Sequence, residues 1–230
     1  MEESLDFILH HLRSQGSPLQ HCVINAGKVV LAQAHPDLAD IVNRCPLINA
    51  DGMAVVWAAR FLGSPMPERV AGIDLMFELL GRVAQTGHRV FLLGAREDVV
   101  QRVADTFKVD YPGINICGFR DGYWSPEEEP HVVAEIAAHN PDILLLAFSS
   151  PKKEIFANRY LNELGARVII GVGGSFDVVA GVTKRAPVWM QRSGLEWFYR
   201  FAQEPIRMFK RYVIGNLHFA LIVIRQRFRG

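Results

Sequence analysis

The chain has 230 residues, of which half are hydrophobic and 21% are charged, and its net charge is +1. This composition is typical of a folded globular protein and shows no sign of disorder or low complexity. The three cysteines, Cys22, Cys45 and Cys117, lack metal-ligand spacing, and their odd number argues against a disulfide framework. We therefore expect reduced thiols in a cytosolic protein.

Charge is distributed unevenly along the chain. From Lys184 to the end there are ten Lys/Arg and two Asp/Glu, a net charge of +8. The preceding residues contain fifteen Lys/Arg and twenty-two Asp/Glu, a net charge of −7. Such asymmetry indicates a polyanionic partner, which could be nucleic acid, a membrane surface or a phosphorylated substrate.

The first predicted element is a helix at residues 1–13, where the sequence is acidic and then amphipathic. This pattern argues against a signal peptide. Short apolar, β-branched runs then alternate with helical patterns. The runs predict six strands, at residues 21–26, 47–50, 89–94, 114–118, 143–148 and 167–172. The helices predicted between them include residues 53–62, 75–86, 97–107, 126–139 and 152–164.

The strand at residues 143–148 is apolar on successive positions rather than on alternate ones. This pattern is typical of strands that are buried on both faces, as in a parallel sheet covered by helices. The predicted fold class is therefore α/β, with a largely parallel sheet sandwiched by helices. Because ligands in such sheets lie beyond the carboxyl ends of the strands, the residues that follow each strand are the first candidates for a site.

Asp51 follows the second predicted strand and precedes a predicted helix. It could cap that helix, or it could be a carboxylate that takes a proton from an attacking hydroxyl, and one residue could do both. Arg69 lies in the turn-rich segment 67–72. It could pair with Glu68 or Asp74, or it could bind phosphate through its planar guanidinium group.

Two further segments follow buried strands. In segment 149–154 (SSPKKE), Lys152 and Lys153 stand at a helix start where they could help to hold an anion, or they could simply be solvated. Segment 171–177 (GVGGSFD) fails the G-x-G-x-x-G pattern because Phe176 occupies the third glycine position. Its glycines could allow the backbone to approach a diphosphate, or they could form a tight turn.

The last part of the chain interleaves aromatic residues with Lys and Arg and then becomes largely apolar at residues 212–224. That run is shorter than the roughly 20 residues of a spanning helix, and Gly215, Asn216 and His218 interrupt it. The pattern favours a basic, amphipathic helix that lies in the membrane interface.

Several motifs are absent from the sequence. There is no H-E-x-x-H or other paired metal spacing, no D-x-D triplet and no G-x-S-x-G elbow. We therefore expect no metal and no cofactor, and we expect a departing diphosphate to be stabilised by protein cations.

Taken together, these blocks resemble the bacterial WecG/TagA/CpsF glycosyltransferases (glycosyltransferase family 26). The matching segments run in family order from about Asn25 to Tyr212: 48–53, 67–72 with Asp74, 90–95, 149–154, 171–177, 184–187, 194–200 and 203–205. The resemblance implies a Rossmann-like, GT-E type fold. It also implies an α/β nucleotide-sugar-binding catalytic domain over residues 1–183 and a basic appendage over residues 184–230 that closes the site and touches the membrane.

The activity that the resemblance implies is inverting, metal-independent transfer from a UDP-sugar to a sugar on undecaprenyl diphosphate, in surface or exopolysaccharide synthesis. It implies a peripheral location at the cytoplasmic face of the inner membrane. By position, Asp51 would be the general base. The substrate-binding residues would be Asn25, Arg69, Gly94, Phe148, Lys153, Gly171, Gly173, Arg200, Arg207 and Lys210.

The chain departs from the family pattern at three positions. Val23 replaces a frequent Thr, which could remove a polar contact, Ser149 replaces the usual Gly, and Lys153 replaces the usual Gln. A cation at position 153 could favour an acidic sugar or an acceptor phosphate. The family commonly begins with a strand before the first helix, whereas this sequence starts in the helix, so either the sequence is short or one edge strand is absent.

Three rival functions stay open at this stage. One is a non-catalytic, membrane-associated scaffold that binds nucleotide-sugars. Another is a nicotinamide-dependent oxidoreductase, against which the missing glycine pattern argues. Nucleic-acid binding ranks last, because the cations of the tail flank an apolar run, and no nucleic-acid partner is expected. The apolar tail could alternatively serve self-association as a homo-oligomer.

Overall fold

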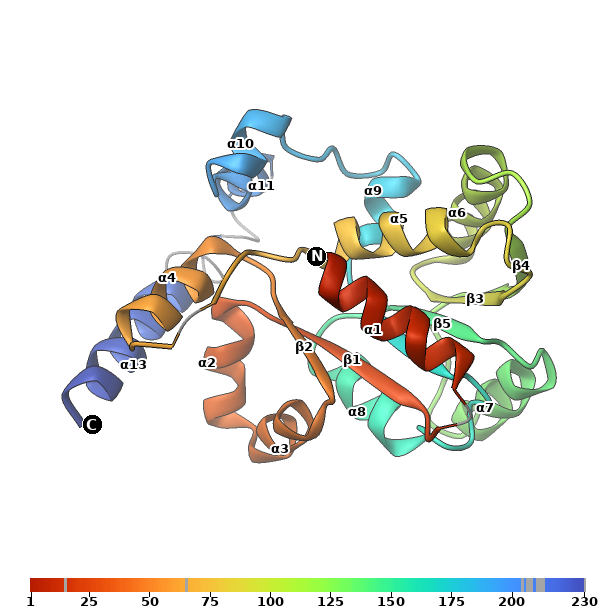
Figure 1. Cartoon of the computed structure of the whole chain (residues 1–230), viewed down its shortest axis with the longest axis horizontal. Coiled ribbons are helices and arrows are strands. Elements are labelled where there is room, and N and C mark those ends of the chain that lie inside the picture. The colour runs from red at the N-terminus through yellow and green to blue at the C-terminus, as the bar shows by residue number, and fades with distance from the viewer. Residues whose placement is uncertain (15, 65, 204, 206–208, 210–213, 230) are drawn as a thin grey trace. The chain divides into compact units, whose positions relative to one another are not determined.

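The structure is a computed structural model that describes residues 1–14, 16–64, 66–203, 205, 209 and 214–229. Its strands are β1 (Leu19–Ile24), β2 (Leu47–Ala50), β3 (Arg89–Gly94), β4 (Asn115–Arg120), β5 (Ile143–Ala147) and β6 (Val168–Gly171). Its first helices are α1 (Glu2–Arg13), α2 (Ala26–Ala34), α3 (Pro36–Arg44), α4 (Met53–Phe61), α5 (Gly72–Val83) and α6 (Glu97–Asp110). The later helices are α7 (Glu129–Ala138), α8 (Lys152–Arg159), α9 (Ser175–Val179), α10 (Val188–Arg192), α11 (Glu196–Gln203) and α13 (Gly215–Arg229) (Figure 1).

The six strands form one parallel sheet in the order β2-β1-β6-β5-β3-β4, which confirms the predicted α/β class. Neighbouring strands are in a register that places apolar residues in rows, such as Val90, Ile143 and Val168, all of which are fully buried. Such continuous burial requires helices on both faces of the sheet. Figure 1 shows α5 and α6 on the opposite side of the sheet from α8.

One layer of the core lies between the sheet and helices α7 and α8. Phe91, Leu144 and Ile169 point toward these helices from three neighbouring strands. From the helices, Ile136 of α7 and Phe156 of α8 complete the layer. Alternate strand residues face the other side, where α1 contacts β6 and α6 contacts β3 and β4.

The chain divides into two compact units that do not follow a single cut in the sequence. Unit 1 comprises residues 1–22, 41–48 and 72–183, and unit 2 comprises residues 23–40, 49–71 and 184–230. The boundary between residues 183 and 184 is therefore also a boundary between the units. Besides the C-terminal segment, unit 2 includes the two stretches of chain that follow β1 and β2. These stretches contain Asn25, Asp51 and Arg69.

Two helices differ most in extent from their predicted ranges. The helix expected at residues 75–86 is α5, which begins at Gly72, because Ile73 and Met76 join Leu79, Leu80 and Val83 in one buried stripe. The helix expected at residues 152–164 is α8, which ends at Arg159, and turns follow it up to Gly165. Among the described helices, none is both long enough and apolar enough to cross a membrane.

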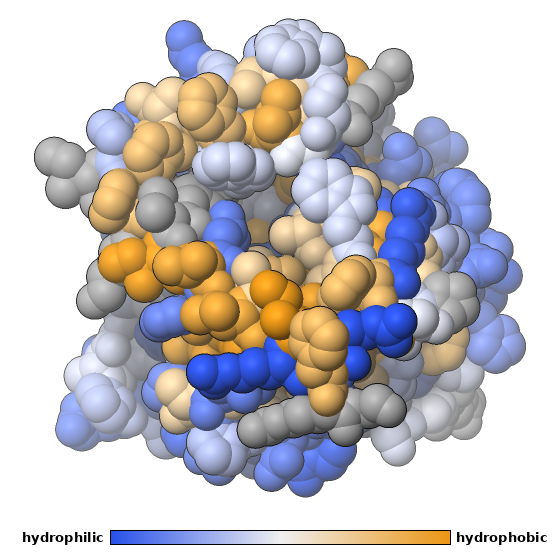
Figure 2. Space-filling model, turned by 90° about the vertical axis from the view of Figure 1, so that its left-hand side faces the viewer, coloured by the Kyte–Doolittle hydropathy of each residue, from blue (hydrophilic) through white to orange (hydrophobic). Residues whose placement is uncertain are grey.

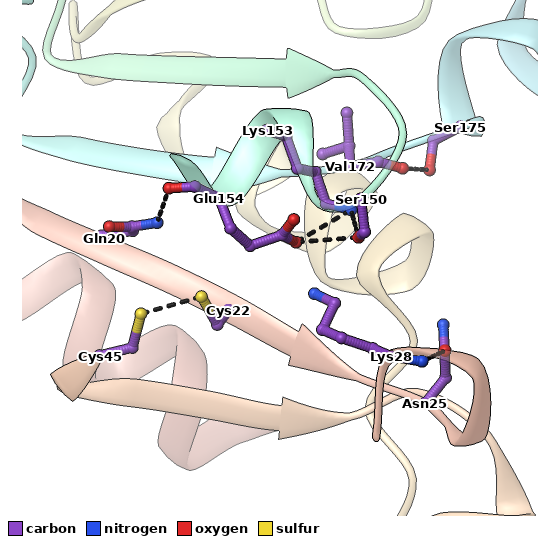
Figure 3. Close-up of polar contacts among 10 residues, drawn as sticks. All are labelled: Gln20, Cys22, Asn25, Lys28, Cys45, Ser150, Lys153, Glu154, Val172 and Ser175. Atoms are coloured by element: carbon purple, nitrogen blue, oxygen red, sulfur yellow. Dashed lines mark hydrogen bonds and ion pairs between the residues drawn. The ribbon is translucent and has the colours of Figure 1, made fainter. Parts of the chain in front are cut away.

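Cys22 lies in β1 and Cys45 lies two residues before β2. Although they are distant in sequence, the two cysteines lie side by side inside unit 1. Their sulfur atoms lie 2.8 Å apart, and both side chains are buried (Figure 3). Both are free thiols, as is Cys117. The sulfur of Cys117 donates a hydrogen bond to the carbonyl oxygen of Val90, and burial raises the pKa of this thiol.

Candidate active site

Backbone hydrogen bonds join the three predicted site segments of unit 2. The N–H of Asp51 donates to the carbonyl oxygen of Ile24 at 2.7 Å, next to Asn25. The N–H of Val70 donates to the carbonyl oxygen of Ala50 at 2.9 Å, which fixes Arg69 beside the same loop. The structure therefore brings the residues that follow β1 and β2 together with the segment of Arg69.

Asp51 is half-buried and lies between β2 and α4. The helix begins at Met53, so its N-cap is Gly52. The capping role considered for Asp51 is therefore wrong, because Gly52 occupies that position. What stays open to Asp51 is a role toward a substrate, which the half-buried position at a strand end allows.

Asn25, in contrast, is a helix cap, which the sequence analysis missed because it placed this residue within a strand. Its side-chain oxygen accepts a hydrogen bond from the N–H of Lys28 at 2.9 Å, and α2 begins directly after it (Figure 3). Asn is among the preferred N-cap residues, so its side-chain type was the available signal. Lys28 itself is a cation only 5% exposed that the sequence analysis did not single out.

Arg69 belongs to a cluster of three charged side chains in unit 2. Its Nη1 lies 3.3 Å from Oε2 of Glu196, and Nε of Arg185 lies 3.5 Å from Oε1 of the same carboxylate. The three side chains are between 15% and 18% exposed, so solvent screens their interaction less than at an open surface. The sequence analysis considered Glu68 and Asp74 as partners of Arg69 and missed Glu196, which is 127 positions away.

In unit 1, Lys153 of α8 lies beside the end of β6. Its ammonium group donates to Oγ of Ser150 at 2.6 Å and lies 3.1 Å from Oε1 of Glu154, which is almost fully buried (Figure 3). A Cβ atom at Gly171 would come within 2.9 Å of the aliphatic stem of Lys153. The absence of a side chain at position 171 therefore accommodates this lysine.

Three other predicted site residues of unit 1 have structural environments of their own. Gly94 ends β3 against the backbone of Ala147. The ring of Phe148 is buried and makes edge contacts with Trp124 and Phe156. The N–H of Gly173 donates to the carbonyl oxygen of Leu146, so this backbone donor is used within the fold.

Arg207 and Lys210 lie outside the described residues, and Arg200 is described only as part of the backbone of α11. The predicted diphosphate contacts of these three residues thus stay predictions. Within the described ranges, no group of three or more His, Cys, Asp or Glu side chains is placed so that it could hold a metal ion.

The parallel sheet and the polar residues at its strand ends define an α/β protein of the class that binds ligands at the carboxyl edge of the sheet. The pattern that describes the glycosyl transferase WecG/TagA/CpsF family matches residues 1–230. The chain belongs to this family and is a glycosyltransferase of cell-envelope polysaccharide synthesis.

Two relatives have the same name, N-acetylglucosaminyldiphosphoundecaprenol N-acetyl-beta-D-mannosaminyltransferase. The relative from Bacillus subtilis strain 168 is 35% identical over 222 residues, which are 96% of this chain and 85% of the relative. The relative from Bacillus spizizenii strain W23 is 35% identical over 214 residues, which cover 88% of this chain and 82% of the relative.

Proposed function

We propose that the protein transfers a sugar from a UDP-sugar to a sugar on undecaprenyl diphosphate, with inversion at the anomeric carbon and without a metal ion. The names of the two Bacillus relatives support the class of acceptor, because both specify N-acetylglucosaminyldiphosphoundecaprenol. They also make N-acetylmannosamine the first donor sugar to test. This chain and those relatives align over most of their lengths.

The observation that carries the proposal is the position of Asp51, half-buried at the end of β2 and held beside Asn25 and Arg69 by two backbone hydrogen bonds. The Asp51 carboxylate takes the proton of the acceptor hydroxyl while that oxygen bonds to the anomeric carbon. The bond from this carbon to UDP breaks, and UDP leaves with the electron pair. Arg69 stabilises the departing diphosphate.

The proposal includes association with the membrane surface through an apolar face of unit 2. This α4–α13 face consists of exposed apolar side chains at helical spacing on the two helices: Trp57, Phe61, Leu217, Leu221, Ile224 and Phe228. The guanidinium carbon of Arg227 lies 5.9 Å from the ring centroid of Phe61, so the two helices meet there. Figure 2 shows apolar side chains gathered on this side of the protein.

Exposed cations accompany this face, namely Arg60, Arg225 and Arg227. An exposed apolar helix face next to Arg residues is typical of peripheral binding to anionic lipid. Because the proposed acceptor is attached to a lipid, such binding would bring the site to its substrate. The proposed location is the cytoplasmic face of the inner membrane, where UDP-sugars are available.

A UDP-release assay tests the proposal. The purified protein is incubated with a panel of UDP-sugars and N-acetylglucosaminyldiphosphoundecaprenol in detergent, with EDTA present and absent. We expect UDP to be released with at least one donor, at a rate that EDTA does not change. The same protein without acceptor is the control. No release with any donor would contradict the transfer, and loss of release with EDTA would contradict metal independence.

A further inference from the structure

Glu196 connects two arginines from distant parts of the sequence. Arg69 comes from the segment before α5, Arg185 from the segment before α10, and Glu196 is the first residue of α11. The carboxylate has one oxygen near each guanidinium group, at 3.3 Å and 3.5 Å. Two guanidinium groups therefore share this carboxylate, and the three side chains are at most 18% exposed. Two partly buried guanidinium groups held side by side suit an anionic ligand such as a diphosphate.

The backbone around Arg185 is held in place on both sides. The side-chain amide of Gln203, in α11, donates to the carbonyl oxygen of Lys184 at 3.1 Å. The side-chain amide of Gln191, in α10, donates to the carbonyl oxygen of Ala186 at 2.6 Å. The backbone of Arg185 is therefore held by hydrogen bonds to the carbonyl groups on either side of it. This restricts the positions that its side chain can reach.

A close contact also fixes the turn before Glu196 against the loop of Asp51. Gly194 has a φ of +72°, and a Cβ atom there would lie 2.7 Å from Cγ of Met53. Met53 begins α4, two residues after Asp51. The trio is thus connected to the neighbourhood of Asp51 twice, through Met53 and through the backbone hydrogen bond that fixes the segment of Arg69.

We infer that Arg185 is a second guanidinium contact for the diphosphate of the nucleotide donor, and that Glu196 is the positioning residue that orients Arg69 and Arg185 as a pair. This inference rests on the proposed function. A guanidinium group binds phosphate oxygens through a planar fork, so its orientation matters as well as its charge. A carboxylate that engages both groups sets this orientation before the donor arrives.

Binding of UDP by isothermal titration calorimetry, combined with steady-state kinetics, tests the inference. We expect Arg185→Ala to weaken UDP binding by about tenfold or more, as for the loss of a charge-assisted hydrogen bond. Arg185→Lys, which keeps the charge and loses the fork, should restore only part of the affinity. Glu196→Gln should raise both the Kd for UDP and the KM for the donor about threefold or more, while the KM for the lipid-linked acceptor stays unchanged.

The exposed pair Arg82–Glu2 of unit 1 offers controls, because Arg82→Ala and Glu2→Gln break an Arg–Glu ion pair that involves no predicted site residue. These controls should bind UDP like the parent. Near-parental UDP affinity in both Arg185 variants would overturn the inference, and so would tighter binding by Glu196→Gln, which would mean that Glu196 competes with the diphosphate. If the parent protein itself binds no UDP, the proposed function fails as well. If the parent binds UDP and only the Arg185 and Glu196 variants behave unexpectedly, this inference alone fails.

Discussion

Gly94 illustrates how a residue at a strand end can be required by the fold itself. Its φ is +124°, and a Cβ atom would lie 2.8 Å from the carbonyl oxygen of Ala147 on the neighbouring strand. Gly87 also has a positive φ, of +76°, but a Cβ atom there would meet no atom within 4 Å. A substitution at Gly87 would therefore add backbone strain alone, whereas a substitution at Gly94 would add both strain and a steric clash.

We expect Gly94→Ala to lower the free energy of unfolding by about 3 kcal/mol or more, because strain of roughly 1–3 kcal/mol adds to a backbone clash. Gly87→Ala should cost about 1–2 kcal/mol from strain alone. Urea unfolding monitored by tryptophan fluorescence measures both variants. Equal losses would show that the contact with Ala147 relaxes freely, and Gly94 would then be explained by strain or by a ligand.

Lys153 is the residue at which the sequence analysis expects a charged side chain in place of the usual Gln of the family. Its ammonium group is held by Ser150 and Glu154, and its stem lies against Gly171. We expect a cation at this strand end to favour a substrate that carries an additional negative charge. Lys153→Gln should then lower the ratio of kcat/KM for a UDP-uronic acid to that for the neutral UDP-sugar, by about fivefold or more for the loss of a hydrogen bond to a charged group.

The panel of donors in the UDP-release assay measures this ratio directly. Lys152→Gln is the matched control, because Lys152 is the adjacent lysine but lies over the rings of Trp124 and Phe148. An unchanged donor ratio in a folded Lys153→Gln protein would remove the specificity role, and a loss of stability in that variant would leave Lys153 as part of a structural ion pair with Glu154.

At the scale of elements, helices α4 and α13 are unusual because they expose large apolar side chains at helical spacing. Leu221 is 44% exposed and Phe228 is 83% exposed. The opposite side of α13 faces the protein, where Phe219 is buried and the helix packs against α2. An amphipathic helix that is anchored on one side and apolar on the other can bind a lipid surface without unfolding.

We expect the double variant Leu221→Asp/Phe228→Asp to reduce co-sedimentation with vesicles of phosphatidylglycerol and phosphatidylethanolamine at least tenfold, because two charges would have to enter the interface. Val109→Asp is the control, since Val109 is 77% exposed on α6 of unit 1. Unchanged sedimentation of the double variant would contradict the membrane role. If the variant instead dissociates an oligomer in size-exclusion chromatography, the face mediates self-association.

At the scale of the whole molecule, the strands of the sheet and the helices between them were largely predictable from local patterns. The run of apolar residues at 143–148 is β5 (Ile143–Ala147), because burial on both faces leaves a signal in consecutive residues. Ends of elements were less predictable, as at Asn25, where an apolar run continues past the strand and only the side-chain type marks the helix cap.

The site was predictable only in part, because its key contacts join residues that are far apart in the sequence. Asp51 and Arg69 were found from strand ends and family blocks, but nothing local indicates that Glu196 lies between Arg69 and Arg185. Such contacts depend on tertiary packing, which periodicity and residue type do not encode. The division into units has the same origin, because unit 2 collects three separate stretches of chain.

The central claim is that Asp51 is the general base of sugar transfer from a UDP-sugar to a lipid-linked acceptor. Positioned proton transfer contributes about 10²–10⁴-fold in rate. The most direct measurement compares kcat of the parent and of Asp51→Asn with UDP-N-acetylmannosamine and N-acetylglucosaminyldiphosphoundecaprenol, alongside UDP binding and thermal unfolding. The account predicts a fall in kcat of at least about 10²-fold with UDP affinity and unfolding temperature near those of the parent. A folded Asp51→Asn protein that turns over like the parent would contradict it.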